Sequence, residues 1–267
     1  LPSCEAMEPN QGGIILGKDN NWYFLTHHGT GDWSGRIVSL LPVTWVQDWP
    51  IPGEVLPQNI GTMKWDGKIP FKHTEKLSIK RSDDFDEDCL APQWQWNYQP
   101  RKDYFSLTER PGWLRLKAYR PLETNNLLKA GNTLTQRTFR KQNNDVTIKM
   151  DISNMQDGQK NGLCHFSSQH SAIGIVKEED ACYLEYRKNG NITKGIQIHS
   201  EFVWFRTEWG MDGKSQYYYS LDGDNFLPFG EKYQLTWGNY RGDRIGIYCF
   251  NDKKETGSVD VDYCHYR

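Results

Sequence analysis

Residues 21–53 read NWYFLTHHGTGDWSGRIVSLLPVTWVQDWPIPG and decide the fold of the first part of the chain. Two runs of aromatic, β-branched and aliphatic residues, at 21–28 and 36–45, flank a segment rich in Gly, Thr and Asp. A shorter run, GGIIL at 12–16, precedes them, and the intervening GKDN is typical of a hairpin turn. We therefore expect three consecutive antiparallel strands between residues 12 and 45.

A meander of this length has the size of one blade of a β-propeller. A single blade cannot close a ring, and it cannot bury both of its faces by itself. We therefore expect residues 1–55 to be a fragment of a larger propeller, or to depend on a neighbouring structure for stability.

The composition limits the classes of function. The 267 residues carry 32 Lys and Arg against 34 Asp and Glu, a net charge of −2, which argues against a nucleic-acid partner. No run of about 18 apolar residues is present, so no membrane partner is expected. Aromatic residues make up 13% of the chain. Their rings suit stacking on sugars and equally suit β-strands, and composition leaves both interpretations open.

Six cysteines are present without a C-x-x-C motif, which argues against a structural zinc site. Cys249 and Cys264 lie in consecutive expected strands and form the first pair to test for a disulfide. Free buried thiols are the alternative.

From residue 78 onward, short strand-like runs recur with turn residues between them. At least eleven such runs favour a two-sheet sandwich with a jelly-roll or lectin-like layout. In DVTIKMDI (145–152), alternation places Val146, Ile148 and Met150 on one core-facing side. Residues 56–77 show little alternation and are interpreted as a linker. The sequence thus predicts an all-β chain with a propeller fragment at 1–55 and a sandwich at 78–267.

Several stretches resemble glycoside hydrolase family 43. Residues 10–53 are similar to the last blade of its five-bladed propellers, which remove xylose or arabinofuranose from plant polysaccharides. In the β-xylosidase and α-L-arabinofuranosidase branch, a concanavalin-like sandwich follows the propeller. Six further stretches of this chain resemble that sandwich: DDF (83–85), PQWQWNYQP (92–100), FSLTERPGWLRLKA (105–118), NTLTQRTF (132–139), YYYSLDGDNF (217–226) and VDVDYCHY (259–266). These motifs, in this order, cover nearly the whole chain.

The resemblance implies catalysis by three carboxyl groups: an Asp general base, a Glu general acid, and an Asp that tunes the acid. In the family these come from earlier blades, so we expect no catalytic residue in this chain. An N-terminal propeller segment, as a separate chain, would supply them, and this chain alone would be inactive. Asp32 lies in a turn-like segment, and Glu109 is expected to hold a turn through a backbone hydrogen bond. Inverting hydrolysis requires two carboxyl groups on opposite sides of the sugar.

Four residues of the propeller fragment are candidates for substrate binding. The resemblance places Arg36 where the family's arginine reaches the sugar, and a guanidinium fork can donate to two hydroxyls. His27 and His28 point to opposite faces of a strand, and we expect His28 to face the pocket. Gln11 lies where many relatives carry a histidine beside a central channel that can hold Ca²⁺. Trp33 is the tryptophan expected to stack on sugar, whereas Trp45 and Trp49 are expected to pack within the blade. Structural ion pairs and hydrogen bonds are the alternatives.

The sandwich supplies two more sets of candidates. In several relatives a loop near its C-terminal end carries an aromatic ring toward the active site, and LTWGNYRGDRIG (235–246) matches that loop, with Trp237 and Tyr240. Asp84 and Asp262 lie in the first and last segments of the sandwich, where they could hold a structural Ca²⁺. Hydrogen bonding in turns is the alternative for both carboxylates.

The sequence therefore predicts part of a glycosidase that acts on xylo- or arabino-oligosaccharides. Such substrates are extracellular, which favours a secreted or periplasmic location over the cytoplasm. The alternative function is a carbohydrate-binding sandwich module without chemistry, which the fold and the tryptophan-rich surface also suit.

Overall fold

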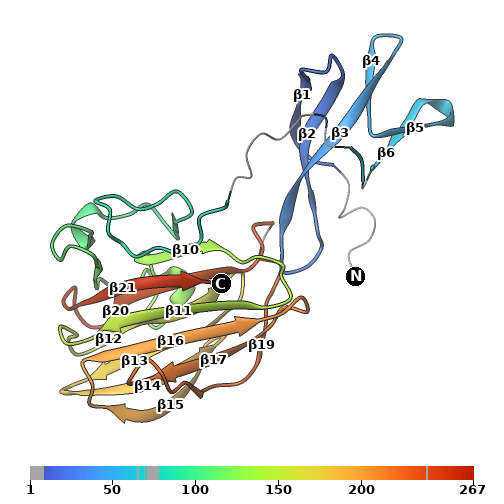
Figure 1. Cartoon of the computed structure of the whole chain (residues 1–267). Coiled ribbons are helices and arrows are strands. Elements are labelled where there is room, and N and C mark those ends of the chain that lie inside the picture. Colours follow the sequence, from blue (N-terminus) through green and yellow to red (C-terminus); the bar gives the residue numbers. More distant parts are fainter. Residues whose placement is uncertain (1–8, 65, 69, 71–77, 239) are drawn as a thin grey trace. The chain divides into compact units, whose positions relative to one another are not determined.

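The computed structural model describes residues 9–64, 66–68, 70, 78–238 and 240–267 (Figure 1). The chain divides into two compact units, Leu1–Ile79 and Lys80–Arg267. Each unit is built from antiparallel strands, and the described residues contain only short 3-10 turns besides: η2 (Pro57–Asn59), η3 (Lys102–Tyr104) and η4 (Leu127–Lys129). The expectation of an all-β chain is confirmed.

The first unit is a four-stranded meander in sequence order. Its strands are β1 (Gly12–Leu16), β2 (Trp22–Gly29), β3 (Arg36–Val46) and β4 (Trp49–Pro52). The first three match the runs expected from the sequence. A small hairpin of β5 (Glu54–Leu56) and β6 (Ile60–Thr62) follows within the segment interpreted as linker. Strands of three residues are too short to show alternation, which is why the sequence did not reveal them.

Both faces of the four-stranded sheet are apolar. Residues that pair directly across antiparallel strands share a face, and neighbours along a strand alternate. One face carries Ile15, Leu25, Val38 and Trp49, and the other carries Ile14, Leu16, Ile37 and Trp45. All eight side chains are exposed; Val38 and Trp49 are each 75% exposed.

The second unit is a sandwich of two antiparallel sheets. The seven-stranded sheet has the order β15 (Asn191–Ile198), β14 (Ala181–Lys188), β13 (His170–Glu178), β12 (Gln159–Phe166), β20 (Arg244–Asn251), β10 (Thr133–Arg137) and β7 (Gln95–Trp96). The eight-stranded sheet has the order β18 (Leu227–Pro228), β17 (Lys214–Ser220), β16 (Phe202–Trp209), β11 (Asn144–Asp151), β21 (Ser258–Tyr266), β9 (Leu114–Lys117) and β8 (Phe105–Ser106), with β19 (Tyr233–Gln234) paired to β17.

Alternating apolar side chains of the two sheets form the core. Val146, Ile148 and Met150 on β11 have no exposed surface, as their spacing predicted. Leu163 and Ile173, from the seven-stranded sheet, are equally buried. The eleven longer strands expected in this region are all present, within a few residues at each end.

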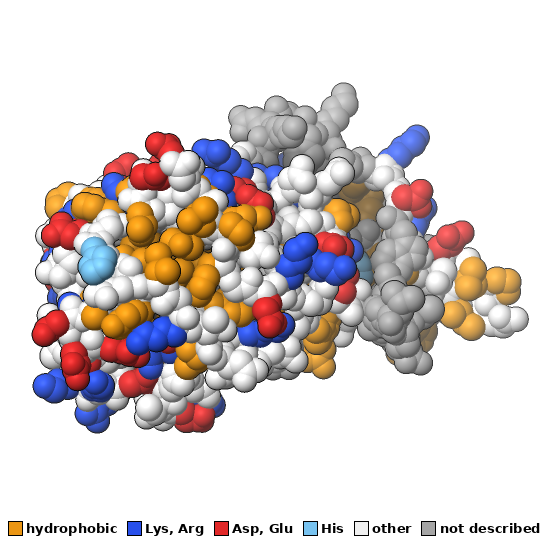
Figure 2. Space-filling view, turned by 90° about the horizontal axis from the view of Figure 1, so that it is seen from below, with side chains coloured by type: hydrophobic (Ala, Val, Ile, Leu, Met, Phe, Trp, Pro, Cys, Tyr) orange, Lys and Arg blue, Asp and Glu red, His pale blue; other side chains and the backbone are white. Residues whose placement is uncertain are grey.

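A second apolar cluster covers part of the opposite, outer face of the seven-stranded sheet. The segment before β10 lays Leu127 and Ala130 onto this face. There they pack against Cys164, Phe166, Ala172, Tyr248 and Phe250, all buried. Loop 118–131 thus acts as a partial cover for the sheet. Figure 2 shows the molecule from below, where apolar side chains lie among charged ones. Among the exposed apolar residues of the sandwich are Ile192 and Ile196 of β15 and Leu227 of β18.

The disulfide considered for Cys249 and Cys264 is absent. Cys249 lies on β20 in one sheet and Cys264 on β21 in the other, and both are free. Burial raises the pKa of Cys249 to about 12. The alternative of free buried thiols is therefore correct for this pair: Cys249 Sγ donates to the Leu116 carbonyl at 3.6 Å, and Cys264 Sγ accepts from Gln136 Nε2 at 3.7 Å.

Candidate functional site

The loop between β2 and β3 is held by the carboxylate of Asp32. Its Oδ1 accepts hydrogen bonds from Thr30 Oγ1 and from the Ser34 backbone N–H, both at 2.9 Å. The Thr30 N–H donates to the Gly35 carbonyl at 2.8 Å and closes the turn. Asp32 therefore works as a turn-forming residue, as its Gly- and Thr-rich context suggested.

Arg36 begins β3 directly opposite Gly29, at the end of β2. It is half-buried. The pairing places Arg36 on the same face as Val38 and His27, whereas His28 shares the other face with Ile37 and Ser39. The two residues expected together in a pocket thus leave the sheet on opposite sides. Finding this from sequence would have required the strand register, which the Gly-rich loop does not reveal.

His28 is buried and joined to Ser39, with 2.5 Å between Nδ1 and Oγ. Burial lowers the pKa of His28, with a smaller contribution from the charge of His27, so the ring is neutral at pH 7. His27 has a buried Nδ1 without a hydrogen-bond partner. Of the pair, His27 is therefore the one with an unused polar atom, and it lies on the Arg36 face.

The remaining candidates of the first unit differ in exposure. Gln11 is exposed beside β1, and its backbone carbonyl accepts a hydrogen bond from Thr26 at 3.1 Å. Trp33 is only 4% exposed. Trp45 meets Trp22 edge to face, with ring centroids 5.5 Å apart, yet it remains 44% exposed. Trp49 is more exposed still, so these two rings have faces available for a covering structure.

The carboxyl groups of Asp19 and Glu109 are unsuited to general acid catalysis because hydrogen bonds lower the pKa of each. Asp19 accepts hydrogen bonds from Asn21 Nδ2 at 3.0 Å and Tyr23 OH at 2.7 Å, which lower its pKa. A general acid needs a raised pKa. Glu109 is paired with Lys117 at 2.5 Å and Arg115 at 3.3 Å, and the Lys117 hydrogen bond is the main cause of its lowered pKa.

Glu109 was expected to hold its turn through the backbone. The structure gives that function to Ser106, whose Oγ accepts the N–H groups of Thr108 at 3.1 Å and Glu109 at 3.0 Å. The expectation for Glu109 was therefore wrong, because a shorter hydroxyl nearer the turn makes those bonds and leaves the carboxylate to its cationic neighbours.

Trp237 and Tyr240 lie in the loop between β19 and β20. Their rings meet edge to face with centroids 5.8 Å apart, and Tyr240 is 56% exposed. The base of this loop is fixed by Asp243, whose Oδ2 accepts the Thr236 N–H at 3.1 Å. Asp243 Oδ1 also lies 3.1 Å from Nδ1 of the fully buried His165. Burial raises the pKa of Asp243, and contact with His165 opposes this shift.

The two carboxylates proposed for calcium each face a basic side chain. Asp84 Oδ1 is 2.7 Å from His265 Nε2, and Asp262 Oδ2 is 2.7 Å from Lys149 Nζ. In the described part of the chain, no group of three or more His, Cys, Asp or Glu side chains could hold a metal ion. The calcium site stays a prediction, and its ion would have to displace both neighbours.

Two of the stretches that resemble the family, DDF (83–85) and PQWQWNYQP (92–100), form hydrogen bonds that hold the sandwich together. Asp83 accepts the Trp94 indole N–H at 2.7 Å and pairs with the last strand through its backbone. Asn97 donates to the carbonyls of Leu128 and Ala130, both at 3.0 Å. The Asn97 bonds and the backbone pairing of Asp83 with Cys264 join segments distant in sequence, so these polar residues fix the scaffold and its loops.

A four-stranded meander with two apolar faces, followed by a two-sheet sandwich, places the chain in the class of all-β proteins built from a blade-like meander and a sandwich. Residues 82–267 match the family described as Beta xylosidase C-terminal Concanavalin A-like domain. The chain belongs to glycoside hydrolase family 43.

Relatives and solved structures agree with this membership. The chain is 34% identical over 281 residues to a beta-xylosidase of Formosa agariphila, covering 96% of this chain and 47% of that protein. It is 31% identical over 241 residues to a putative beta-xylosidase of Xylanibacter ruminicola, covering 89% and 44%. A bifunctional GH43-CE protein of Bacteroides eggerthii matches with TM-score 0.78 and 27% identity, covering 97% of this chain and 34% of that one. The chain spans about half the length of the two beta-xylosidases.

Among the described residues, no helix is both long and apolar enough to cross a lipid bilayer.

Proposed function

We propose that this chain is the C-terminal part of an inverting glycosidase that releases xylose or arabinofuranose from arabinoxylan oligosaccharides. An N-terminal propeller segment, as a partner polypeptide, would supply the general acid, the general base and the tuning carboxylate. The observation that carries the proposal is the four-stranded sheet with exposed apolar side chains on both faces.

A sheet buried on one side alternates apolar and polar residues, whereas a sheet between two layers is apolar on both sides. Leu25 and Val38 on one face, with Ile37 and Trp45 on the other, follow the second pattern. The blades of a propeller meet their neighbours in this way. Further blades packed against both faces would remove these side chains from water and position the partner's carboxyl groups.

The chain's own share of the chemistry would be to bind and orient the sugar. Arg36 would donate two hydrogen bonds from one rigid group to neighbouring hydroxyls. His27 on the same face offers a further ring nitrogen. Inversion needs an acid and a base about 6.5–9.5 Å apart with a water between the base and the sugar. Asp19 and Asp32 are occupied by local hydrogen bonds. This supports assigning the general acid and the general base to the partner polypeptide.

The test uses the purified chain with 4-nitrophenyl β-D-xyloside and 4-nitrophenyl α-L-arabinofuranoside. We expect no hydrolysis by the chain alone. Release of nitrophenol should follow addition of the part of the Formosa agariphila beta-xylosidase that this chain does not match. NMR should then show the inverted anomer first. In the mixture, Arg36→Ala should lower kcat/KM by about 10- to 100-fold, and Lys18→Ala, in the exposed turn before β2, should not. Substantial hydrolysis by the pure chain would disprove the assignment of the carboxyl groups.

Because the proposed substrates are extracellular polysaccharides, we also propose a secreted or periplasmic location. Fractionation of the source cells with an antibody against the sandwich would check it.

A further inference from the structure

We propose that the outer face of the seven-stranded sheet carries a second, non-catalytic binding site for a neutral oligosaccharide. The site is a pocket of about 770 Å³ beside the part of the sheet that loop 118–131 covers. This volume lies within the ~300–1,000 Å³ of small-molecule sites. Only the choice of xylan-type sugars as ligand rests on the proposed function.

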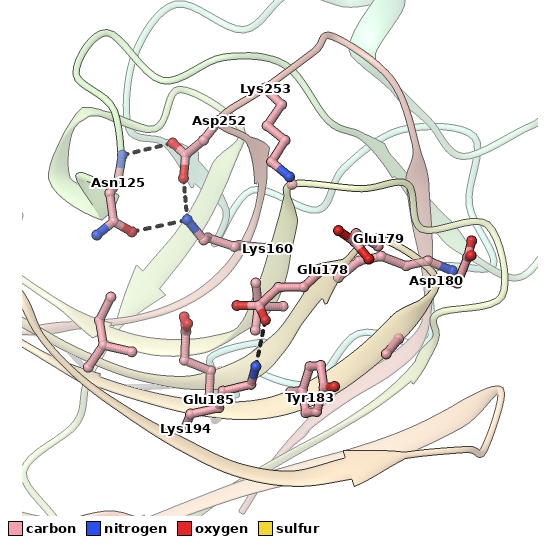
Figure 3. Close-up of a pocket in the computed structure, with 15 residues that line it drawn as sticks. Asn125, Lys160, Glu178, Glu179, Asp180, Tyr183, Glu185, Lys194, Asp252 and Lys253 are labelled. Atoms are coloured by element: carbon pink, nitrogen blue, oxygen red, sulfur yellow. Dashed lines mark hydrogen bonds and ion pairs between the residues drawn. The ribbon is translucent and has the colours of Figure 1, made fainter.

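The pocket is formed where a covering loop meets several strands of one sheet, β13 and β15 among them. Asn125 comes from loop 118–131, Lys160 from β12, Tyr183 and Glu185 from β14, and Asp252 follows β20. Figure 3 shows Asn125, Lys160 and Asp252 together on one side of the pocket, with Glu178, Lys194 and Tyr183 on another. The cover provided by Leu127 and Ala130 stops short of this region, which leaves the sheet open there.

One wall of the pocket is fixed by a network of charged hydrogen bonds. Lys160 Nζ donates to Asp252 Oδ2 and, at 3.1 Å, to Asn125 Oδ1. The Asn125 N–H donates to Asp252 Oδ1 at 2.7 Å. Arg187 Nη1 also reaches Asn125 Oδ1 at 2.8 Å, and its Nε donates to Glu185. The side chains of Lys160 and Asp252 are only 14% and 10% exposed, so these groups are held in place before a ligand arrives.

Another wall of the pocket is formed by an exposed ion pair over an aromatic ring. Lys194 pairs with Glu178 at 2.5 Å and lies 3.5 Å from the centre of the Tyr183 ring. Both charged side chains are about half exposed, so opening this pair costs little. Movement of Lys194 would uncover an aromatic face suited to the apolar side of a sugar.

The charges of the lining select a neutral ligand. The lining carries the lysines Lys160, Lys177, Lys194 and Lys253 and the carboxylates Glu178, Glu179, Asp180, Glu185 and Asp252. This near balance disfavours a polyanion, which the carboxylates would repel, and a polycation, which the lysines would repel. Hydroxyl groups can donate to the carboxylates and accept from the ammonium groups without desolvating a new charge. A neutral polyhydroxylated chain therefore fits this pocket best.

The test measures binding of xylohexaose to the full chain by isothermal titration calorimetry, with no hydrolysis required. Tyr183→Ala should weaken binding by about tenfold, the value of a lost aromatic contact. Asp252→Asn should weaken xylohexaose binding more than Tyr183→Ala does, because it removes the charge that holds Lys160 in place. Tyr218→Ala is the matched control, since Tyr218 is equally half-buried but lies on β17 of the other sheet. Thermal melts confirm that each variant is folded.

Three results would overturn the proposal. Wild-type chain that shows no binding at roughly millimolar xylohexaose has no such site. Tighter binding of polygalacturonate would contradict the charge argument. Loss of binding on Arg36→Ala, with Tyr183→Ala unchanged, would assign the sugar to the propeller fragment instead. A failure of the reconstituted enzyme to hydrolyse xylosides leaves these measurements intact, so the two proposals fail separately.

Discussion

Replacing Asp260 with alanine tests which carboxylates stabilise the sandwich. Asp260 lies on β21, and its side chain is 2% exposed. Arg115 holds it with a two-pronged contact, Nε to Oδ1 at 2.7 Å and Nη2 to Oδ2 at 2.8 Å. Arg110 Nη1 adds a third hydrogen bond at 2.9 Å.

The magnitude follows from what the substitution leaves behind. Removing one member of a buried ion pair costs about 3–5 kcal/mol because the other charge stays desolvated. Arg110 keeps Asp151 at 2.7 Å, and the two guanidinium groups are 32% and 23% exposed, so some of the loss is recovered. We therefore expect Asp260→Ala to lower the free energy of unfolding by about 3 kcal/mol, or Tm by roughly 6–12 °C for a unit of this size.

Asp262→Ala provides the control on the same strand. Asp262 is paired with Lys149, and both side chains are about one quarter exposed, which places this pair in the range of about 0–1 kcal/mol. Urea unfolding followed by tryptophan fluorescence measures both variants against wild type. If Asp260→Ala and Asp262→Ala lower stability equally, or Asp260→Ala costs under about 1 kcal/mol, the reasoning from burial is refuted.

Three further predictions concern thiols, pH and calcium. In native protein, thiol reagents should label the exposed Cys89 but not the buried Cys249 and Cys264, which should react only after unfolding; mass spectrometry of digests shows which sites are labelled. Burial, aided by nearby Arg187, lowers the pKa of His170 to about 4, so the folded state disfavours its protonated form. The destabilising effect of His170 is absent above its unfolded-state pKa of 6.5 and grows as the pH drops from 6.5 toward about 4, because only the unfolded chain then binds the proton. His170→Gln should therefore reduce the difference between the urea midpoints measured at pH 7 and pH 4.5. Binding of Ca²⁺ at Asp84 and Asp262 predicts a higher Tm with added calcium that Asp262→Ala abolishes, whereas an equal rise in both proteins would contradict the site.

Local patterns were sufficient for the strands but not for the site. Runs such as DVTIKMDI predicted strand and core side chains together, because one period-2 pattern determines both. The positions of Arg36 and His28 could not be obtained in that way. Their relative orientation depends on the register that joins Gly29 to Arg36 across a six-residue loop. A shift of one residue would have reversed it.

The polar pocket lay wholly beyond the sequence patterns. Asn125 and Asp252 are 127 residues apart, yet they share a hydrogen bond at 2.7 Å. No motif joins them, and each residue alone resembles an ordinary surface or turn residue. Asn125 precedes β10 and Asp252 follows β20, so their meeting requires β10 to pair with β20, and that pairing is selected by long-range packing between strands.

By itself, the sequence determined the all-β class, most strand positions and the family, because alternation and motif order are properties of the chain read in one dimension. Only the tertiary structure decided the strand order in each sheet and placed Cys249 and Cys264 in different sheets. It also decided that both faces of the four-stranded sheet are apolar and that charged side chains gather over the seven-stranded sheet. The physical reason is that these features depend on register and layer. Burial of apolar surface over the whole molecule selects both, and no local preference specifies either.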